Sequence, residues 1–328
     1  MDVRILREAE IRRLVSPAQA LAAVREAFVK LARGQATLPG VIGLDIPEHE
    51  GEVHVKGAYL HGSPFFSIKE AAGFYANVRR GLPVSSGLVL VFDAPTGMLR
   101  MILLDNGFLT ELRTGAAGAL AADLLARRDV ETVGIIGSGG QARYQLEALL
   151  GVRRPRRVRV YGRTPTSASS YAREMSERFG LDVSAVPSAR EAVIESDIVI
   201  TTTPSREPIV RADWLRAGTH VTAVGSDGPD KRELESAVLA RADLVVADRL
   251  DQCLRLGEIH HAVAEGAIEA GRVHAELGAI AAGLARGRGS DGEITVADLT
   301  GVGVQDAAMA DLVAAAALAG DLGQSITV

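Results

Sequence analysis

The fold is decided by the stretch TVGIIGSGGQARYQLEALL, residues 132–150. Residues 132–137 are mostly apolar and predict a buried strand, and a helix is expected from about residue 141 to 150. The pattern G-x-G-x-x-A lies between them, in the strand–turn–helix context that dinucleotide binding requires. Its first glycine permits a tight turn, its second lets the backbone approach a pyrophosphate, and its alanine allows close helix–strand packing. We therefore expect cofactor contacts from Gly137, Ser138, Gly139, Gly140, Gln141 and Ala142, against the alternative of a plain glycine-rich turn.

Toward the C-terminus, strands and helices alternate, which predicts parallel strands joined by helical crossovers and hence a doubly wound sheet. Helices are expected at about 166–179 and within SAREAVIES, residues 188–196. The further strands are expected at 157–162, 182–186, 197–203, 220–226, 243–249 and 294–301.

Toward the N-terminus the pattern changes. Residues 35–104 contain short apolar runs separated by Gly, Pro and Ser, which indicates a β-rich region. Helices are expected at 16–34, where Ser16 is a suitable N-cap, and at 108–127. The Ala-rich C-terminal segment is also predicted to be helical. This region and the Rossmann sheet make two domains, as the length of 328 residues favours.

The composition excludes several classes of function. A net charge of −5 argues against nucleic acid or an anionic membrane as the main partner. The single cysteine, Cys253, excludes an internal disulfide and a Cys-rich metal site, and the neighbours His260 and His261 point in different directions on a helix, so no metal is expected. Without a signal peptide or a long apolar run, we expect a cytoplasmic protein. Lysine is rare, occurring only at Lys30, Lys56, Lys69 and Lys231.

The end of the second Rossmann strand selects the cofactor. An acidic residue there would bind the ribose hydroxyl of NAD, whereas this chain has Arg163 and Thr164. A guanidinium and a hydroxyl suit a 2′-phosphate, so NADP(H) is favoured over NAD(H). The alternative is a solvent-exposed arginine in an arginine-rich chain.

Several stretches together resemble the ornithine cyclodeaminase/mu-crystallin family, and most closely its ectoine-utilisation branch. They include LTELRTGAAGALAADLLA at 109–126, IVITTTPS at 198–205, VGSDGPDKREL at 224–234, LGEIHHAV at 256–263 and ITVADLTGVGVQDAAMA at 294–310. The resemblance implies a homodimer of two-domain subunits that acts on small amino or imino acids with NAD(P). It implies a substrate and dimerisation domain over 1–118, completed by about 305–328, and a Rossmann domain over 119–304.

The same resemblance implies roles for individual residues. Lys69 would contact the substrate carboxylate and donate a proton, Arg113 would clamp the carboxylate, and Asp227 would act near the substrate amine. The alternatives are a surface lysine, a helix ion pair and a turn aspartate. The remaining residues expected near the cofactor are Thr202, Thr203, Ser226 and Lys231. Lys56 has no role that we can derive from the sequence.

The chain also departs from the cyclodeaminases. They carry a further carboxylate-binding arginine near residue 40, where residues 38–42 here read LPGVI, and they lack a residue like Arg163. We therefore expect an imino-acid reductase that is reversible as an amino-acid dehydrogenase. A cyclodeaminase that converts a diamino acid to a cyclic amino acid plus ammonia is the alternative, and a non-catalytic NADPH- or ligand-binding protein of mu-crystallin type is a second one.

Overall fold

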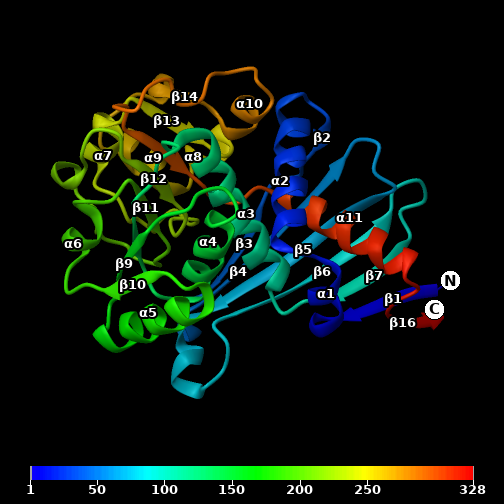
Figure 1. Ribbon diagram of the computed structural model, residues 1–328. Helices are drawn as coiled ribbons and strands as arrows, with labels where there is room; N and C mark the ends of the chain where they lie inside the picture. Colours follow the sequence, from blue (N-terminus) through cyan, green and yellow to red (C-terminus); the bar gives the residue numbers. More distant parts are fainter. Residues whose placement is uncertain (1, 328) are drawn as a thin grey trace. The chain divides into compact units, whose positions relative to one another are not determined.

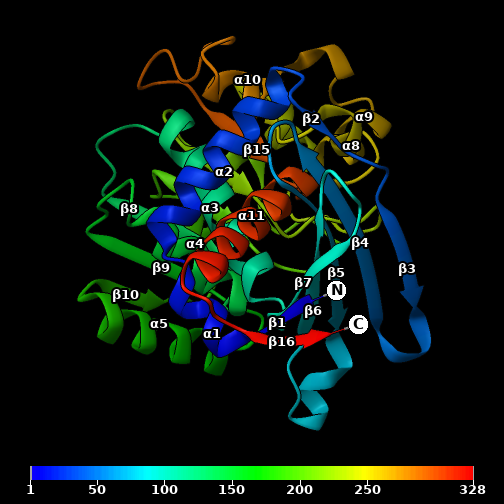
Figure 2. The same ribbon diagram turned by 90° about the vertical axis from the view of Figure 1, so that its right-hand side faces the viewer.

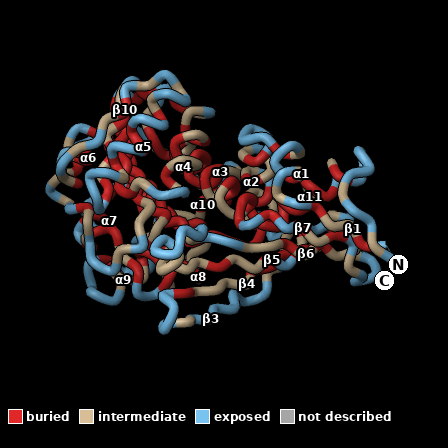
Figure 3. Tube along the Cα trace, turned by 90° about the horizontal axis from the view of Figure 1, so that it is seen from below, coloured by how far each residue is buried: buried red, intermediate tan, exposed pale blue. Residues whose placement is uncertain are grey.

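The computed structural model describes residues 2–327, which divide into two compact units. The first unit runs up to Arg113 and resumes at Val302, and the second comprises Thr114–Gly301. In each unit the buried residues, red in Figure 3, fill the interior. Within the described part of the chain, no helix combines the length and apolarity needed to cross a bilayer.

The first unit is built on an eight-stranded sheet that is mostly antiparallel. The strand order is β16-β1-β7-β6-β5-β4-β2, and β3 pairs with β4. The strands are β1 (Asp2–Arg7), β2 (Ala36–Thr37), β3 (Ile42–Ile46), β4 (Gly51–Leu60), β5 (Phe65–Phe74), β6 (Ser85–Asp93), β7 (Leu99–Leu104) and β16 (Gln324–Thr327).

Helices α1 (Glu8–Leu14), α2 (Pro17–Ala32) and α11 (Gly303–Ala319) complete this unit. The predicted start of α2 is confirmed, because the Ser16 hydroxyl accepts a hydrogen bond from the backbone N–H of Gln19. Helix α11 packs against α2, β4 and β5, and Figure 2 shows α11 in red beside α2 in blue. The C-terminal helix therefore lies on the strands that carry Lys56 and Lys69.

The two ends of the chain form strands that the sequence pattern did not predict. Strand β1 pairs antiparallel with β16, with Val3 opposite Ile326, so the described ends lie side by side (Figure 1). Both strands are short and extend the β-rich region beyond the predicted 35–104. Such strands have little periodicity of their own, and their pairing comes from partners that are distant in the sequence.

The second unit contains the predicted doubly wound sheet, in which all eight strands run parallel. The order is β10-β9-β8-β11-β12-β15-β13-β14, so the late strand β15 inserts between β12 and β13. The strands are β8 (Thr132–Ile136), β9 (Arg157–Tyr161), β10 (Asp182–Ala185), β11 (Ile198–Thr201), β12 (His220–Ala223), β13 (Leu244–Ala247), β14 (Val273–Glu276) and β15 (Thr295–Asp298).

The strand order places the ligand-binding edge of this sheet. The chain leaves β8 toward β9 on one side and later returns to β11 on the other, so the order reverses between β8 and β11. Open parallel sheets bind ligands at the carboxyl ends of the strands at such a reversal. The helices associated with this unit are α3 (Phe108–Leu125, which enters it at Thr114), α4 (Gly140–Leu149), α5 (Pro165–Phe179), α6 (Ala189–Val193), α7 (Ser236–Arg241), α8 (Leu250–Cys253), α9 (Gly257–Ala264) and α10 (Leu277–Ala281).

Candidate functional site

The glycine-rich turn joins β8 to α4 at the carboxyl edge of the parallel sheet. Gly137 has a φ of +110°, and a Cβ there would lie 2.6 Å from the Thr202 hydroxyl oxygen. Gly139 is the N-cap of α4, and a Cβ on it would meet no heavy atom within 4 Å. Ala142 is buried on the inner face of α4. The turn therefore leaves open space in front of a helix N-terminus, where backbone N–H groups attract a phosphate.

Arg143 supports this turn, although the sequence analysis did not identify it. Its Nη1 donates hydrogen bonds of 2.9 Å to the carbonyl oxygens of both Ser138 and Gly139. Its Nε and Nη2 bind the carboxylate of Glu174 on α5. Because Arg143 binds both backbone carbonyl oxygens, it holds the turn in one conformation without a ligand. The sequence does contain a signal for this contact, because Arg143 lies in the first turn of one predicted helix and Glu174 lies on the next predicted helix.

The residues that follow β9 lie against the same turn. A Cβ on Gly162 would come within 2.6 Å of the Ser138 hydroxyl oxygen, so a longer side chain at this position would displace Ser138. Arg163 is exposed. Thr164 is the N-cap of α5, and its hydroxyl accepts from the backbone N–H of Ser167 at 3.3 Å. Arg163 is thus an accessible cation beside the turn, whereas the Thr164 hydroxyl already caps a helix.

Buried Glu233 connects the loops that follow β11 and β12. Its carboxylate accepts hydrogen bonds from the Thr201 hydroxyl at 2.6 Å, from the Gly225 N–H at 2.8 Å and from the Thr203 N–H. Burial raises the pKa of Glu233 to about 7, and these hydrogen bonds oppose the shift. Glu233 therefore fixes the backbone beside Thr203 and Ser226. No local sequence pattern marks it, because its partners are one hydroxyl and two backbone N–H groups that are not adjacent to it in the sequence.

Asp227 and Lys231 form an ion pair within the loop after β12. Lys231 Nζ lies 2.7 Å from Asp227 Oδ1, and the Asp227 side chain is 38% exposed against 10% for Lys231. The Ser226 hydroxyl donates to the Lys231 carbonyl, and His261 Nε2 lies 2.9 Å from the same oxygen. The predicted residues 226, 227 and 231 thus form one ordered loop. No group of three or more potential ligands for a metal ion occurs among the described residues.

The first unit gathers a second set of charged residues, all buried. Lys69 on β5 lies opposite Lys56 on β4, and directly opposed residues of antiparallel strands share a face. Lys69 Nζ lies 3.2 Å from Asp306 Oδ1, and Arg113 Nε lies 3.1 Å from the same oxygen. The predicted pair Lys69 and Arg113 is therefore brought together, and Asp306 is the buried anion between them.

The electrostatics of this cluster suit a proton transfer. Burial lowers the pKa of Lys69 to about 8, with Arg113 and Lys56 adding to the shift and Asp306 opposing it. Burial alone would raise the pKa of Asp306, but the charges of Lys69, Arg113 and Lys56 hold it below its usual range. The Asp306 carboxylate is thus ionised, and Lys69 can gain or lose a proton close to neutral pH.

The Arg113 side chain is oriented from two sides. Its Nη1 donates a 2.7 Å hydrogen bond to the Gln305 side-chain oxygen, and its Nε faces Asp306. Its third nitrogen, Nη2, takes part in neither of these two contacts. A guanidinium held in this way can offer its remaining donors to a carboxylate.

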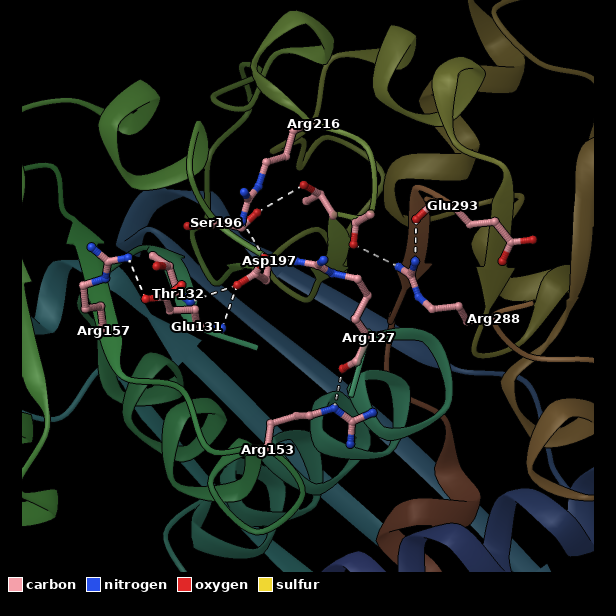
Figure 4. Close-up of polar contacts among 12 residues, drawn as sticks. Arg127, Glu131, Thr132, Arg153, Arg157, Ser196, Asp197, Arg216, Arg288 and Glu293 are labelled. Atoms are coloured by element: carbon pink, nitrogen blue, oxygen red, sulfur yellow. Dashed lines mark hydrogen bonds and ion pairs between the residues drawn. The ribbon is translucent and has the colours of Figure 1, made fainter. Parts of the chain in front are cut away.

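A separate cavity of about 1040 Å³ lies at the opposite, amino edge of the parallel sheet. Its arginines are Arg127, Arg128, Arg153, Arg154, Arg156, Arg157 and Arg216. Figure 4 shows Asp197 between Arg127 and Arg216, with Glu131 and Thr132 beside it. None of the predicted site residues lines this cavity, and parallel sheets typically bind cofactors at the other edge.

Comparisons with known proteins cover nearly the whole chain. The model of the family described as "Ornithine cyclodeaminase/mu-crystallin family" matches residues 1–321. An uncharacterized cyclodeaminase of Sinorhizobium fredii is 44% identical over 94% of both chains.

Two solved structures are similar over almost their full length. An archaeal alanine dehydrogenase dimer with bound NAD is 38% identical, with a TM-score of 0.93 and coverage of 100% of this chain and 99% of that one. The Δ1-pyrroline-2-carboxylate reductase of Thermococcus litoralis, in complex with NADH and L-proline, is 35% identical, with a TM-score of 0.95 and coverage of 99% and 100%.

Proposed function

Because the chain belongs to the ornithine cyclodeaminase/mu-crystallin family, we propose that it is an NAD(P)-dependent reductase of small imino acids, reversible as an amino-acid dehydrogenase. The observation that carries this proposal is the buried cluster in which Lys69 and Arg113 share Asp306. Two cations held out of water beside one carboxylate leave positive charge that a substrate carboxylate can neutralise.

The chain's own residues take these parts in the reaction. Arg113 and Lys69 bind the substrate carboxylate, which orients Cα and the imine nitrogen. The Lys69 ammonium supplies the proton that the amine product needs, directly or through a water, and its lowered pKa makes that transfer feasible near neutral pH. A bound nicotinamide supplies the hydride that Cα receives, or accepts it in the reverse direction.

The residues at the carboxyl edge of the parallel sheet fit such a cofactor. The positive φ of Gly137 and the open space at Gly139 make room for a pyrophosphate at the N-terminus of α4. In this proposal the turn from Gly137 to Ala142 holds the phosphates. The residues Thr202, Thr203, Ser226 and Lys231 lie on the loops that would border the nicotinamide.

We assign NADP(H) as the preferred cofactor. The exposed Arg163 can pair with a 2′-phosphate, and Gly162 carries no acidic side chain to bind a ribose hydroxyl, since a side chain there would displace Ser138. The solved relatives contain NAD or NADH, so the preference of this chain rests on those two residues. The Thr164 hydroxyl caps α5, and it would contribute by donating its hydrogen to the phosphate in place of the Ser167 hydroxyl.

We also propose a homodimer located in the cytoplasm. The archaeal relative is a dimer, and the cytoplasm contains a pool of nicotinamide cofactors. Analytical ultracentrifugation tests the first part, with a sedimenting mass of one subunit as the contrary result. Cell fractionation tests the second.

The reductase proposal is tested by cofactor oxidation with a panel of imino acids. The panel combines α-keto acids with ammonia or methylamine and includes the cyclic imine Δ1-pyrroline-2-carboxylate. We expect NADPH consumption with at least one member and formation of the matching amino acid. Failure of every member, with the cofactor bound, would contradict the proposal.

A cyclodeaminase is the second candidate, because of the Sinorhizobium relative and of Asp227. Asp227 follows β12 at the ligand-binding edge, where it could act near the amine of a diamino acid. Its ion pair with Lys231 engages one carboxylate oxygen. Ammonia release from ornithine or lysine, with only a catalytic amount of NAD and no net change in NADH, would identify this activity. Ammonia release coupled to stoichiometric NADH or NADPH formation would instead identify a dehydrogenase.

A further inference from the structure

The first turn of α11 brings two residues from the far end of the chain to Lys69. Gly303 lies so close to β4 that a Cβ on it would overlap the carbonyl oxygen of Gly57. This approach places Gln305 and Asp306 beside Arg113 and Lys69. The carboxylate also lies in the first turn of the helix, where the helix dipole favours a negative charge.

Asp306 is enclosed by protein. Its side chain is 2% exposed, and its Oδ2 makes no hydrogen bond with another described residue. Its Oδ1 faces two cations within 3.2 Å. The Asp306 carboxylate has the same charge as a substrate carboxylate and is already engaged by both cations, so its effect on the reaction passes through Lys69 and Arg113.

We propose that Asp306 is a positioning residue, which keeps the Lys69 ammonium protonated and aimed at the substrate while it orients Arg113 together with Gln305. This inference rests on the proposed reductase function and adds to it the anion on which the proton donor depends. Without that anion, Lys69 would lie buried between two cations, Lys56 and Arg113, and would lose its proton at a lower pH.

The charged groups around Lys69 come from each element packed on it. Lys56 faces it from β4, Arg113 from α3 and Asp306 from α11. The charge of Lys69 also acts on Glu70, its neighbour on β5, and on Asp105, before α3, where it opposes the rise in pKa caused by burial. Asp306 is the one ion-pair partner that lies within 4 Å of Lys69 Nζ in the described chain, so its removal has the largest expected effect on the proton affinity of Lys69.

The test compares pH profiles of Asp306→Asn and of the wild-type enzyme, with a preformed cyclic imine so that ammonia does not titrate. We expect the alkaline limb of kcat/KM to move to lower pH by about one unit or more in Asp306→Asn. We also expect KM to rise, because Arg113 loses an anchor, and NADPH binding to stay unchanged. The matched control is Asp311→Asn, a half-buried carboxyl on the same helix that lies near Lys30 and Ser63, and its profile should equal the wild-type one.

An alkaline limb at the wild-type pH in folded Asp306→Asn would overturn the inference while leaving the reductase function intact. If Asp306→Asn does not fold, Asp306→Glu serves instead, because it keeps the charge and displaces the carboxylate by one methylene. We expect Asp306→Glu to lower kcat and to leave the alkaline limb of kcat/KM at the wild-type pH. A shift of that limb by about one pH unit would contradict the inference. A wild-type enzyme that neither reduces any imine nor binds pyruvate in calorimetry would refute the reductase function and this inference together.

Discussion

At the scale of single residues, the four lysines of the chain have different fates. Lys69 and Lys56 are buried side by side in the first unit, and Lys231 is paired with Asp227, whereas Lys30 lies on the partly exposed face of α2. An arginine at position 69 would keep its charge at any physiological pH, whereas a buried lysine can release its proton. The rare lysines therefore mark the site better than the common arginines do.

Arg163 is the residue whose replacement tests cofactor choice. We expect Arg163→Ala to weaken NADPH binding roughly tenfold, because a charge-assisted contact to the 2′-phosphate is lost, and to leave NADH binding unchanged. Fluorescence titration of both cofactors measures this. Arg173→Ala, at an exposed position of the neighbouring helix α5, is the control that should change neither affinity. Tighter binding of NADH than of NADPH by the wild-type protein would reject the assignment.

At the scale of elements, Asp197 anchors the amino edge of the parallel sheet (Figure 4). The carboxylate accepts from the Glu131 N–H at 2.7 Å and from the Thr132 N–H at 3.0 Å, and it pairs with Arg127 and Arg216. Asp197→Ala leaves two backbone donors and two arginines without their shared acceptor. We expect it to lower the free energy of unfolding by about 2–4 kcal/mol in urea titrations.

The pH dependence of Asp197→Ala follows from the same contacts. Burial would raise the pKa of Asp197, but the hydrogen bonds and arginines hold it below its usual value of 3.8. A carboxyl whose pKa is lower in the folded state stabilises the fold at pH values above its pKa in the unfolded state. This stabilisation is lost as the pH falls through the pKa of the folded state. The difference in the free energy of unfolding between the wild-type protein and Asp197→Ala should therefore become smaller at acidic pH. Asp182→Ala, which removes an exposed acid, should cost less than about 0.5 kcal/mol, and an equal loss in both variants would contradict this account.

The elements also show how far the sequence alone could lead. The turn at Gly137 and the alternating strands were predictable, because their signals are local: an apolar run, a glycine pattern and a helix period. The role of Asp306 was not predictable, because its partner Lys69 is more than two hundred residues away in the sequence and α11 is Ala-rich with little amphipathic contrast. The position of Lys56 beside Lys69 likewise follows only from the register of β4 with β5, which the sequence pattern does not specify.

At the scale of the whole molecule, buried acids in the second unit tie stability to pH. Burial raises the pKa of Asp298 to about 8 and that of Glu233 to about 7. A carboxyl whose pKa is higher in the folded state stabilises the fold at pH values below its pKa in the unfolded state. This stabilisation is lost as the pH rises through the pKa of the folded state. These two carboxyls should therefore make the free energy of unfolding fall between about pH 4 and 8.

Glu233→Gln tests this link, because it removes one of the two titrations. We expect its free energy of unfolding to vary less with pH than that of the wild-type protein, by about 3 kcal/mol across this window. Urea titrations at several pH values measure the difference. A wild-type slope retained in Glu233→Gln would show that the carboxyl is not the titrating group.

The most direct measurement of the central claim, that a buried lysine and arginine bind the substrate carboxylate for hydride transfer, is the turnover of Lys69→Met. We predict that kcat/KM for imine reduction falls by about a hundredfold or more, while NADPH binding stays within about twofold of the wild-type affinity. Lys30→Met, on the surface of α2, should retain both activities. Turnover of Lys69→Met at the wild-type rate, or a loss of cofactor binding equal to the loss of turnover, would contradict the account.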